Sequence, residues 1–315
     1  MIMTRERVLS GDPRLDAGES AFFLREIEFI KTVTYDVKYK PLKALTILPI
    51  STEANTGASS ITWRQFAMVG AAKIVADYAN DFPRVDVYGA ETETKIKSIG
   101  VSYGYSIQEI RESQYSGKRL DQRRAAAARR DVDQIINQVA FLGDPTNGIT
   151  GFFNANGIQS YTVPAVGTGS SKTWASKTAD QVIADCTGIV STVVSGTNGV
   201  EEPDNLLVPI PNFVLMASTP RSTLSDTTIL EFVLKNSPWL KKVDWIPELA
   251  TAGASGGTRM IVFANDDMHL TLEIPQPFEQ FDPQQKGLEF DIPCHARTAG
   301  AIIYYPLSIA SGDGI

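Results

Sequence analysis

The chain has 315 residues, of which 43% are hydrophobic and 21% charged, so it has the material for a buried core and the composition of a globular protein. Its formal net charge of -7 opposes general binding to nucleic acid, so we expect any contact with DNA to be local. We expect no membrane association, because no apolar run approaches the roughly 18 residues of a span and the N-terminus lacks a secretory core. With only Cys186 and Cys294, the sequence predicts no disulfide framework and a reducing compartment.

Residues 1–50 are predicted to form an N-terminal arm with one short helix. Residues 1–20 are polar and contain glycine and proline, which favours an extended segment that could order against a partner. Ser20 is a suitable N-cap for a helix over residues 21–30, which Phe22, Phe23, Ile27 and Ile30 would anchor. Residues 41–49 form a connector between two prolines.

Two β-rich segments follow, and we expect them to pair. Residues 61–68 are typical of a strand, and residues 95–107 alternate large side chains with glycine and serine. About two dozen residues with several acids separate them, so residues 51–106 are predicted to form a long projecting hairpin. A two-stranded ribbon is marginally stable alone in water, so this hairpin should need the surface of another subunit.

Residues 119–142 predict a long amphipathic helix of about 36 Å at 1.5 Å per residue. Its apolar stripe recurs at three- and four-residue steps. The stripe consists of Ala125, Ala128, Val132, Ile135, Ile136, Val139 and Leu142. The opposite face carries arginines and aspartates, with Arg129 and Asp133 at a spacing that suits an ion pair. Gly143 and Pro145 are the expected stop signal, and a glycine-rich loop continues to Phe153.

The middle of the chain has the pattern of an α/β unit after a Ser/Thr/Gly-rich segment over residues 166–178. Helices are predicted over residues 179–195 and 227–235. Strands are predicted over residues 205–208, 214–217, 243–246 and 259–263. The tail is predicted to return as β structure over residues 269–274 and 288–305, with a turn at residues 281–287.

Three patterns are similar to those of catalytic, phosphate-binding or metal sites, but each lacks the neighbouring elements or the spacing that such a site needs. Residues 253–257 match G-x-S-x-G but precede a strand, whereas a nucleophile elbow follows one. Residues 167–173 are similar to a phosphate loop, but Ser171 stands where that motif has glycine, and no apolar strand leads in. Neither the group Asp266, Asp267 and His269 nor the pair Cys294 and His295 has metal-ligand spacing. We therefore expect no enzyme activity, no catalytic or metal residues and no cofactor.

The order of parts resembles the major capsid proteins of tailed phages, which have the Hong Kong 97-type shell fold. The sharpest segment is residues 141–153, since such proteins commonly leave their spine helix through a turn of the form G…G(I/L)xG(F/L). The resemblance implies an α+β fold with four parts. These are an N-terminal arm and short helix (1–50), an extended loop or β-hairpin (51–106), a peripheral domain with the spine helix 119–142 (107–158 and 270–299), and an α/β axial domain (159–269 and 300–315).

The resemblance also implies the function. The chain would form the hexamers and pentamers of an icosahedral phage shell around double-stranded DNA, which it would meet by non-specific proximity. It would be made in the host cytoplasm and reside in the virion, with portal, scaffolding or decoration proteins as further partners. The expected neighbour contacts are Trp63, Phe66 and Tyr103 on the hairpin and Arg123, Arg124, Arg129 and Arg130 along the shell wall. Intrachain packing of the aromatics and a solvated helix face for the arginines remain open alternatives.

Two other functions are compatible with parts of this pattern. An encapsulin-like nanocompartment shares the fold but encloses a cargo enzyme, and would have a groove on its inner side for a short apolar peptide. The long arm and long hairpin favour the phage shell. A soluble α/β hydrolase or binding protein is the remaining alternative.

Overall fold

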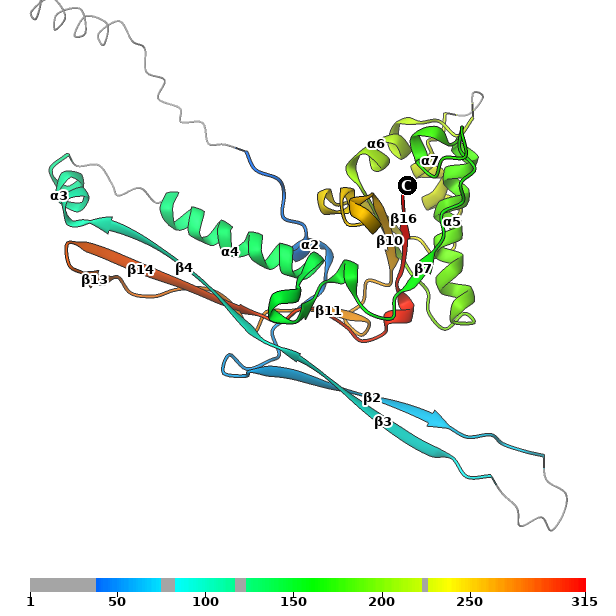
Figure 1. The fold of residues 1–315 in the computed structure, drawn as a ribbon, viewed down its shortest axis with the longest axis horizontal. Helices are drawn as coiled ribbons and strands as arrows, with labels where there is room; N and C mark the ends of the chain where they lie inside the picture. The colour runs from blue at the N-terminus through cyan, green and yellow to red at the C-terminus, as the bar shows by residue number, and fades with distance from the viewer. Residues whose placement is uncertain (1–37, 75–82, 117–122, 223–225) are drawn as a thin grey trace, which may run out of the picture. The chain divides into compact units, whose positions relative to one another are not determined.

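The computed structural model describes residues 38–74, 83–116, 123–222 and 226–315 (Figure 1). The chain divides into two compact units, residues 1–41 and residues 42–315, and the elements below belong to the second. The predicted arm residues 1–37, including the expected helix at 21–30, lie outside the described residues, as do residues 119–122 at the start of the expected spine helix. No helix in the described part of the chain is long and apolar enough to cross a membrane.

A five-stranded mixed sheet forms the first layer, in the strand order β7-β16-β10-β8-β9. Its strands are β7 (Gln159–Tyr161), β8 (Asn205–Val208), β9 (Lys242–Trp245), β10 (Arg259–Phe263) and β16 (Ala310–Asp313). Successive side chains of a strand point to opposite sides of a sheet, and in this sheet the side chains on both sides are buried. Met260 and Val262 of β10 belong to one apolar cluster, and Ile261 and Phe263 belong to another.

Three helices cover the first of these faces. They are α5 (Ala179–Gly196), α6 (Ile210–Ser218) and α7 (Ile229–Asn236). Helix α5 begins with a capping box between Thr178 and Gln181, which confirms its predicted start. The strand predicted at residues 214–217 is wrong, since those residues lie in α6. A run of four apolar residues is compatible with the period of a strand and with that of a helix. The buried positions of α6, Asn212 and Met216, lie one helical turn apart and so form one helical face.

The second layer is the long helix α4 (Arg123–Leu142) on a sheet of β4 (Lys97–Ser106), β12 (Gln276–Gln280), β13 (Gln284–Lys286) and β14 (Glu289–Thr298) (Figure 1). Strand β4 pairs with β14 along all ten of its residues. The prediction that residues 95–107 pair with residues 61–68 is therefore wrong. Large and small side chains alternate over residues 95–107 because one side of β4 faces the core beneath α4, where Ile99 is buried.

The projecting hairpin instead consists of β2 (Ser60–Val69) and β3 (Asp86–Lys95), which pair in register from Ser60 with Lys95 to Val69 with Asp86. Strand β3 escaped the pattern analysis because its charged and polar residues, with a glycine among them, do not alternate with apolar ones. The short helix α3 (Ile107–Ser116) follows β4 and is capped by reciprocal hydrogen bonds between Ser106 and Glu109.

The predicted connector at residues 41–49 contains a buried helical turn, α2 (Ala44–Ile47). The Asn137 side chain of α4 accepts a hydrogen bond from the Ala44 N–H and donates one to Glu248. Lys43 pairs with Asp244 at the edge of the five-stranded sheet, with a 2.5 Å contact. These contacts join α2 to both layers. A third sheet consists of β1 (Ile50–Ser51), β11 (Leu270–Glu273) and β15 (Gly300–Ile303), in the strand order β1-β11-β15.

The buried face of α4 differs from the predicted stripe. Ala128, Val132, Ile136 and Val139 are buried as expected, but Ile135 is 45% exposed and Leu142 is 36% exposed. Ala125 is half-buried, while Asn137, Ala140 and Phe141 are buried. The buried face of α4 extends from Ala128 and Val132 toward Ile136, Ala140 and Phe141. At about 100° per residue, Ile135 and Leu142 lie at the edge of this face that is away from Ala140 and Phe141, which agrees with their partial exposure.

The glycine-rich loop after α4 is a small hairpin of β5 (Gly143–Asp144), η2 (Pro145–Asn147) and β6 (Ile149–Thr150), followed by η3 (Phe152–Asn154). Gly143 has φ of 75°, and a Cβ on Gly151 would lie 2.2 Å from the Gly143 nitrogen, so the crossing requires glycine at both positions. The further short 3-10 turns are η4 (Trp174–Ser176), η5 (Pro247–Ala250), η6 (Ala254–Gly256) and η7 (Pro306–Ser308).

Aromatic packing at this loop joins the two layers into one core. The Phe141 ring stacks on the Phe153 ring with centroids 5.0 Å apart, and the Phe152 ring meets Phe263 of β10 edge-on at 5.1 Å. The same apolar cluster contains Val132 and Ile136 of α4. The loop therefore both ends the long helix and fixes it to the five-stranded sheet.

Candidate assembly surfaces

The β2–β3 hairpin has two chemically different faces, since residues paired directly across antiparallel strands share a face. We name the face that carries Arg64, Phe66 and Met68 the outer face. At its base Arg64 forms an exposed ion pair of 2.7 Å with Glu91. Toward its tip it is apolar, with Phe66 68% and Met68 81% exposed, and Val87 lies opposite Met68. These side chains stay more than half exposed in the described subunit, so this apolar half is a candidate surface for another copy.

The opposite, inner face is held by its own subunit at the base. The Trp63 ring packs edge-on against the Tyr304 ring at 5.7 Å, and the Gln65 side chain donates a hydrogen bond to the Tyr304 carbonyl. Trp63 therefore packs within its own chain, which is the alternative that the sequence analysis left open for the aromatic residues. Phe66 is the predicted contact residue that stays exposed.

Tyr103 lies on β4, opposite Ile292 of β14, and so outside the hairpin. Its ring meets the Tyr105 ring edge-on at 6.0 Å. Burial, with smaller contributions from Cys294 and Tyr105, raises the pKa of the Tyr103 hydroxyl. The structure thus separates Tyr103 from Trp63 and Phe66, which the sequence grouped together.

The arginines of α4 have different surroundings. Arg124 binds the Glu109 carboxylate at 2.8 Å and lies over the Tyr105 ring at 4.8 Å, which ties the start of α4 to α3 and β4. The hydrogen bond from Arg124 lowers the pKa of Glu109. Arg129 is exposed and lies 4.0 Å from Asp133, the predicted i,i+4 pair. Arg123 is exposed and Arg130 half-buried on the same helix. The four arginines therefore form no single stripe.

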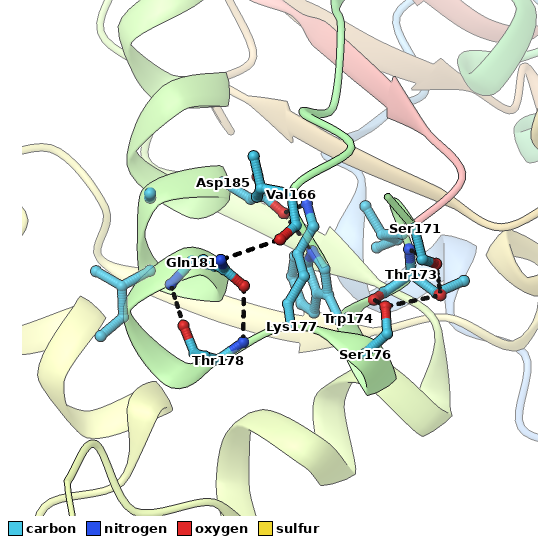
Figure 2. Close-up of polar contacts among 12 residues, drawn as sticks. Val166, Ser171, Thr173, Trp174, Ser176, Lys177, Thr178, Gln181 and Asp185 are labelled. Carbon is cyan, nitrogen blue, oxygen red and sulfur yellow. Dashed lines mark hydrogen bonds and ion pairs between the residues drawn. The ribbon is translucent and has the colours of Figure 1, made fainter. Parts of the chain in front are cut away.

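The Ser/Thr/Gly-rich segment is fastened to α5 by a buried polar cluster, which the sequence analysis missed (Figure 2). The Lys177 ammonium lies 2.6 Å from the Asp185 carboxylate, and the two side chains are 0% and 2% exposed. The indole of Trp174 donates to the same carboxylate oxygen at 2.9 Å. Burial and the neighbouring Asp185 charge raise the pKa of Tyr161 to about 12. Lys177 precedes the N-cap of α5, so no helical spacing relates it to Asp185, and the sequence carried no signal for this pair.

The segment that is similar to a phosphate loop uses its polar groups internally. The Gly167 N–H donates to the Ser171 carbonyl, and the Ser171 and Thr173 hydroxyls lie 2.5 Å apart (Figure 2). The chain then enters the short turn η4 rather than a helix whose free N–H groups could bind phosphate.

Ser255 of the G-x-S-x-G match lies in the turn η6, which precedes strand β10. The loop closes through a hydrogen bond from the Gly253 N–H to the Gly257 carbonyl. This is the reverse of the strand–turn–helix order of a nucleophile elbow. Among the described residues no group of three or more His, Cys, Asp or Glu side chains is arranged to hold a metal ion.

Comparisons with known proteins agree on one class. The capsid protein of Myoviridae phage XM1 superposes with a TM-score of 0.78 over 92% of this chain and 98% of its own, at 16% identity. Mycobacterium phage Bobi matches with a TM-score of 0.63 over 94% and 97%, at 13% identity. A virus-like particle from Pyrococcus furiosus matches with a TM-score of 0.54 over 85% and 90%, at 13% identity. These likenesses establish a mixed α+β fold shared with capsid proteins. A comparison with curated protein sequences gave no match.

Similarity of fold does not assign the chain to a protein family, but the comparison of its sequence with family models does. The family model described as "Major capsid protein" matches residues 70–315, well over half of the chain. That span includes the long helix, the glycine-rich loop and all five strands of the mixed sheet. The protein is therefore a structural component of a virion shell rather than an enzyme: it belongs to the major capsid protein family.

Proposed function

We propose that this chain builds an icosahedral phage shell in which the outer face of the hairpin rests on a neighbouring copy. The observation that carries the proposal is the exposed apolar half of that face, around Phe66 and Met68. A ribbon of two strands cannot bury such side chains against itself, and each copy in a closed assembly supplies the same surface to the next. Repetition over a closed shell makes many modest contacts collectively strong.

The proposed division of labour follows the four parts expected from the sequence. Residues 1–50 would supply the arm, which α2 anchors in the core, and residues 107–158 with 270–299 form a peripheral domain around α4. Residues 159–269 with 300–315 form an axial domain that faces the symmetry axes of hexamers and pentamers. We assign β4 to the peripheral domain as well, because its whole length pairs with β14. The extended loop then ends at Lys95, the last residue of β3.

The shell in this proposal encloses double-stranded DNA without reading its sequence. The net charge of -7 opposes tight general contact, so attraction would be confined to local basic positions such as Arg123 and Arg129. Portal, scaffolding or decoration proteins are the further partners that the proposal includes. A cargo-enclosing compartment is the alternative, and the nucleic acid content of purified particles distinguishes the two.

The test replaces Phe66 and Met68 together. Phe66→Ser with Met68→Ser should leave the subunit folded, because both side chains are exposed, but should prevent closed shells. Circular dichroism and thermal melting report the fold, and sedimentation with negative-stain microscopy reports assembly. Phe66→Leu with Met68→Leu is the matched control, which keeps the face apolar and should assemble. Normal shells from the serine pair would remove the outer face from the assembly mechanism.

A further inference from the structure

A pocket of about 530 Å³ lies at the base of the hairpin. Its walls come from the chain before β2, from β2 itself, from β11 and from the residues after β15, including Trp63, Thr271, Glu273 and Tyr304. The pocket adjoins the attachment of the hairpin, where Trp63 packs on Tyr304. Its lining reaches Arg64 at the base of the outer face but does not include Phe66 or Met68, the apolar residues used in the proposed function.

Glu273 gives this pocket a buried carboxylate that has no counter-ion among the described residues. Its residue is 4% exposed, and its carboxylate accepts a hydrogen bond of 2.8 Å from the Thr271 hydroxyl, which also lies 2.8 Å from the Tyr304 hydroxyl. Within the described ranges, no lysine, arginine or histidine nitrogen comes within ion-pair distance of Glu273. Burying a carboxylate without an opposite charge is costly, so this position favours a cationic guest.

Trp63 supplies a second, independent indication. Its indole nitrogen is buried and has no hydrogen-bond acceptor among the described residues, yet Trp63 lines the same pocket. An indole N–H can only donate, and buried donors in native proteins nearly always have a partner. A guest that carries an acceptor, such as a peptide carbonyl, beside its cationic group would satisfy this N–H.

The charges around the pocket mouth reinforce the preference for a cation. Glu53 and Asp267 are exposed residues of its lining. Burial together with the charges of Glu273 and Glu53 raises the pKa of the Tyr304 hydroxyl, as a negative environment should. Arg64 is the basic residue of the described lining, and its guanidinium is engaged with Glu91.

We propose that this pocket binds a basic side chain of a second copy of the chain, with the Glu273 carboxylate holding the cation and the Trp63 indole donating to a carbonyl of the same segment. The second copy rests on the proposed shell function, in which every subunit meets its neighbours. A bare metal ion is disfavoured, because the described acidic residues do not form a metal-binding group and a metal would leave the indole without an acceptor.

The first test is a titration of the soluble subunit with N-acetyl-argininamide, which carries a guanidinium and amide carbonyls. The readout is the indole N–H resonance of Trp63, assigned by its loss in Trp63→Phe. Saturable movement of this resonance is expected, with N-acetyl-norleucinamide as the uncharged control. Glu273→Gln should weaken the binding at least tenfold, whereas Glu93→Gln on the exposed hairpin should not. No movement in the wild-type protein, or equal binding by the Glu273→Gln subunit, would overturn the proposal.

A second measurement excludes a purely structural role for Glu273. If the carboxylate awaits a cation, Glu273→Gln should raise or preserve the melting temperature of the free subunit while it raises the concentration needed for assembly. A lower melting temperature with unchanged assembly would show that the carboxylate only supports its own fold. The titration needs no assembly, so its failure is distinct from a failure of the Phe66 and Met68 test, which concerns the shell contact itself.

Discussion

Ile136→Ala and Ile135→Ala compare two adjacent positions of α4 with identical chemistry. Ile136 is 3% exposed and belongs to the apolar cluster that joins α4 to both sheets, whereas Ile135 is 45% exposed. The sequence placed both residues on the buried stripe. The structure therefore predicts a large difference between two substitutions that the sequence treats alike.

The magnitude follows from burial. Each substitution removes three carbons, and at about 0.8 kcal/mol per buried carbon the transfer contribution at Ile136 is roughly 2.4 kcal/mol. The cavity left between α4 and its neighbours adds to this, so the expected loss is roughly 2 to 5 kcal/mol. At Ile135 about half of the side chain is already in water, and alanine has the higher helix propensity, so the expected loss is below about 1 kcal/mol.

Urea denaturation of the soluble subunit, followed by circular dichroism, measures both free energies of unfolding. An unchanged dependence on urea concentration would show that the two proteins unfold from comparable native states. Ile135→Ala is the control, because it changes helix propensity and side-chain size as Ile136→Ala does but at a half-exposed position. Equal losses at the two positions, or a larger loss at Ile135, would refute the assigned orientation of α4.

Three further outcomes are expected. Gly151→Ala should prevent native folding or lower the melting temperature sharply, because its Cβ would lie 2.2 Å from backbone atoms, whereas Gly148→Ala, with open space and only a positive φ, should cost about 1 kcal/mol. Lys177→Met should cost about 3 to 5 kcal/mol by thermal denaturation, since it leaves Asp185 buried and unpaired, and adding Asp185→Leu should recover much of the loss. Burial opposes ionisation of Asp313, but the hydrogen bonds from Arg259, at 2.6 Å and 2.9 Å, outweigh it and lower the pKa of Asp313 below its ordinary value of 3.8. The resulting stabilisation is present above pH 3.8 and is lost as the pH falls through the folded pKa, so Asp313→Asn should flatten the acid limb of the melting temperature measured against pH.

The hairpin illustrates how much local pattern can establish. Residues 61–68 were predicted as a strand and lie within β2, and the need for a long projecting ribbon was also predicted. The partner was wrong, because β4 has the stronger alternation and β3 has almost none. Alternation reports burial of one face, and β4 is buried beneath α4 while β3 is exposed along nearly its whole length. Pattern therefore identifies strands that face a core more readily than strands that face water.

Side-chain environments were less accessible to sequence reasoning than elements. Trp63 and Phe66 are three residues apart on one strand, yet the ring of Trp63 packs on Tyr304 while Phe66 is exposed. The pairing of Lys177 with Asp185 depends on which segments meet in space, and so does the absence of a basic partner for Glu273 in the described part of the chain. No spacing rule within one segment encodes a contact between residues 63 and 304.

The sequence by itself determined the α+β class, the end of the long helix at Leu142, the start of α5 at Ala179 and the resemblance to the capsid family. These features rest on local chemistry: helical periodicity, a left-handed glycine after the last turn and a capping box. Only the tertiary structure decided that β4 pairs with β14, that Ile135 faces outward and that Glu273 is buried beside Trp63. Those outcomes depend on packing between segments that lie about two hundred residues apart in the sequence. Local sequence does not distinguish the possible partners of such a segment, so the free energy of burial selects among them.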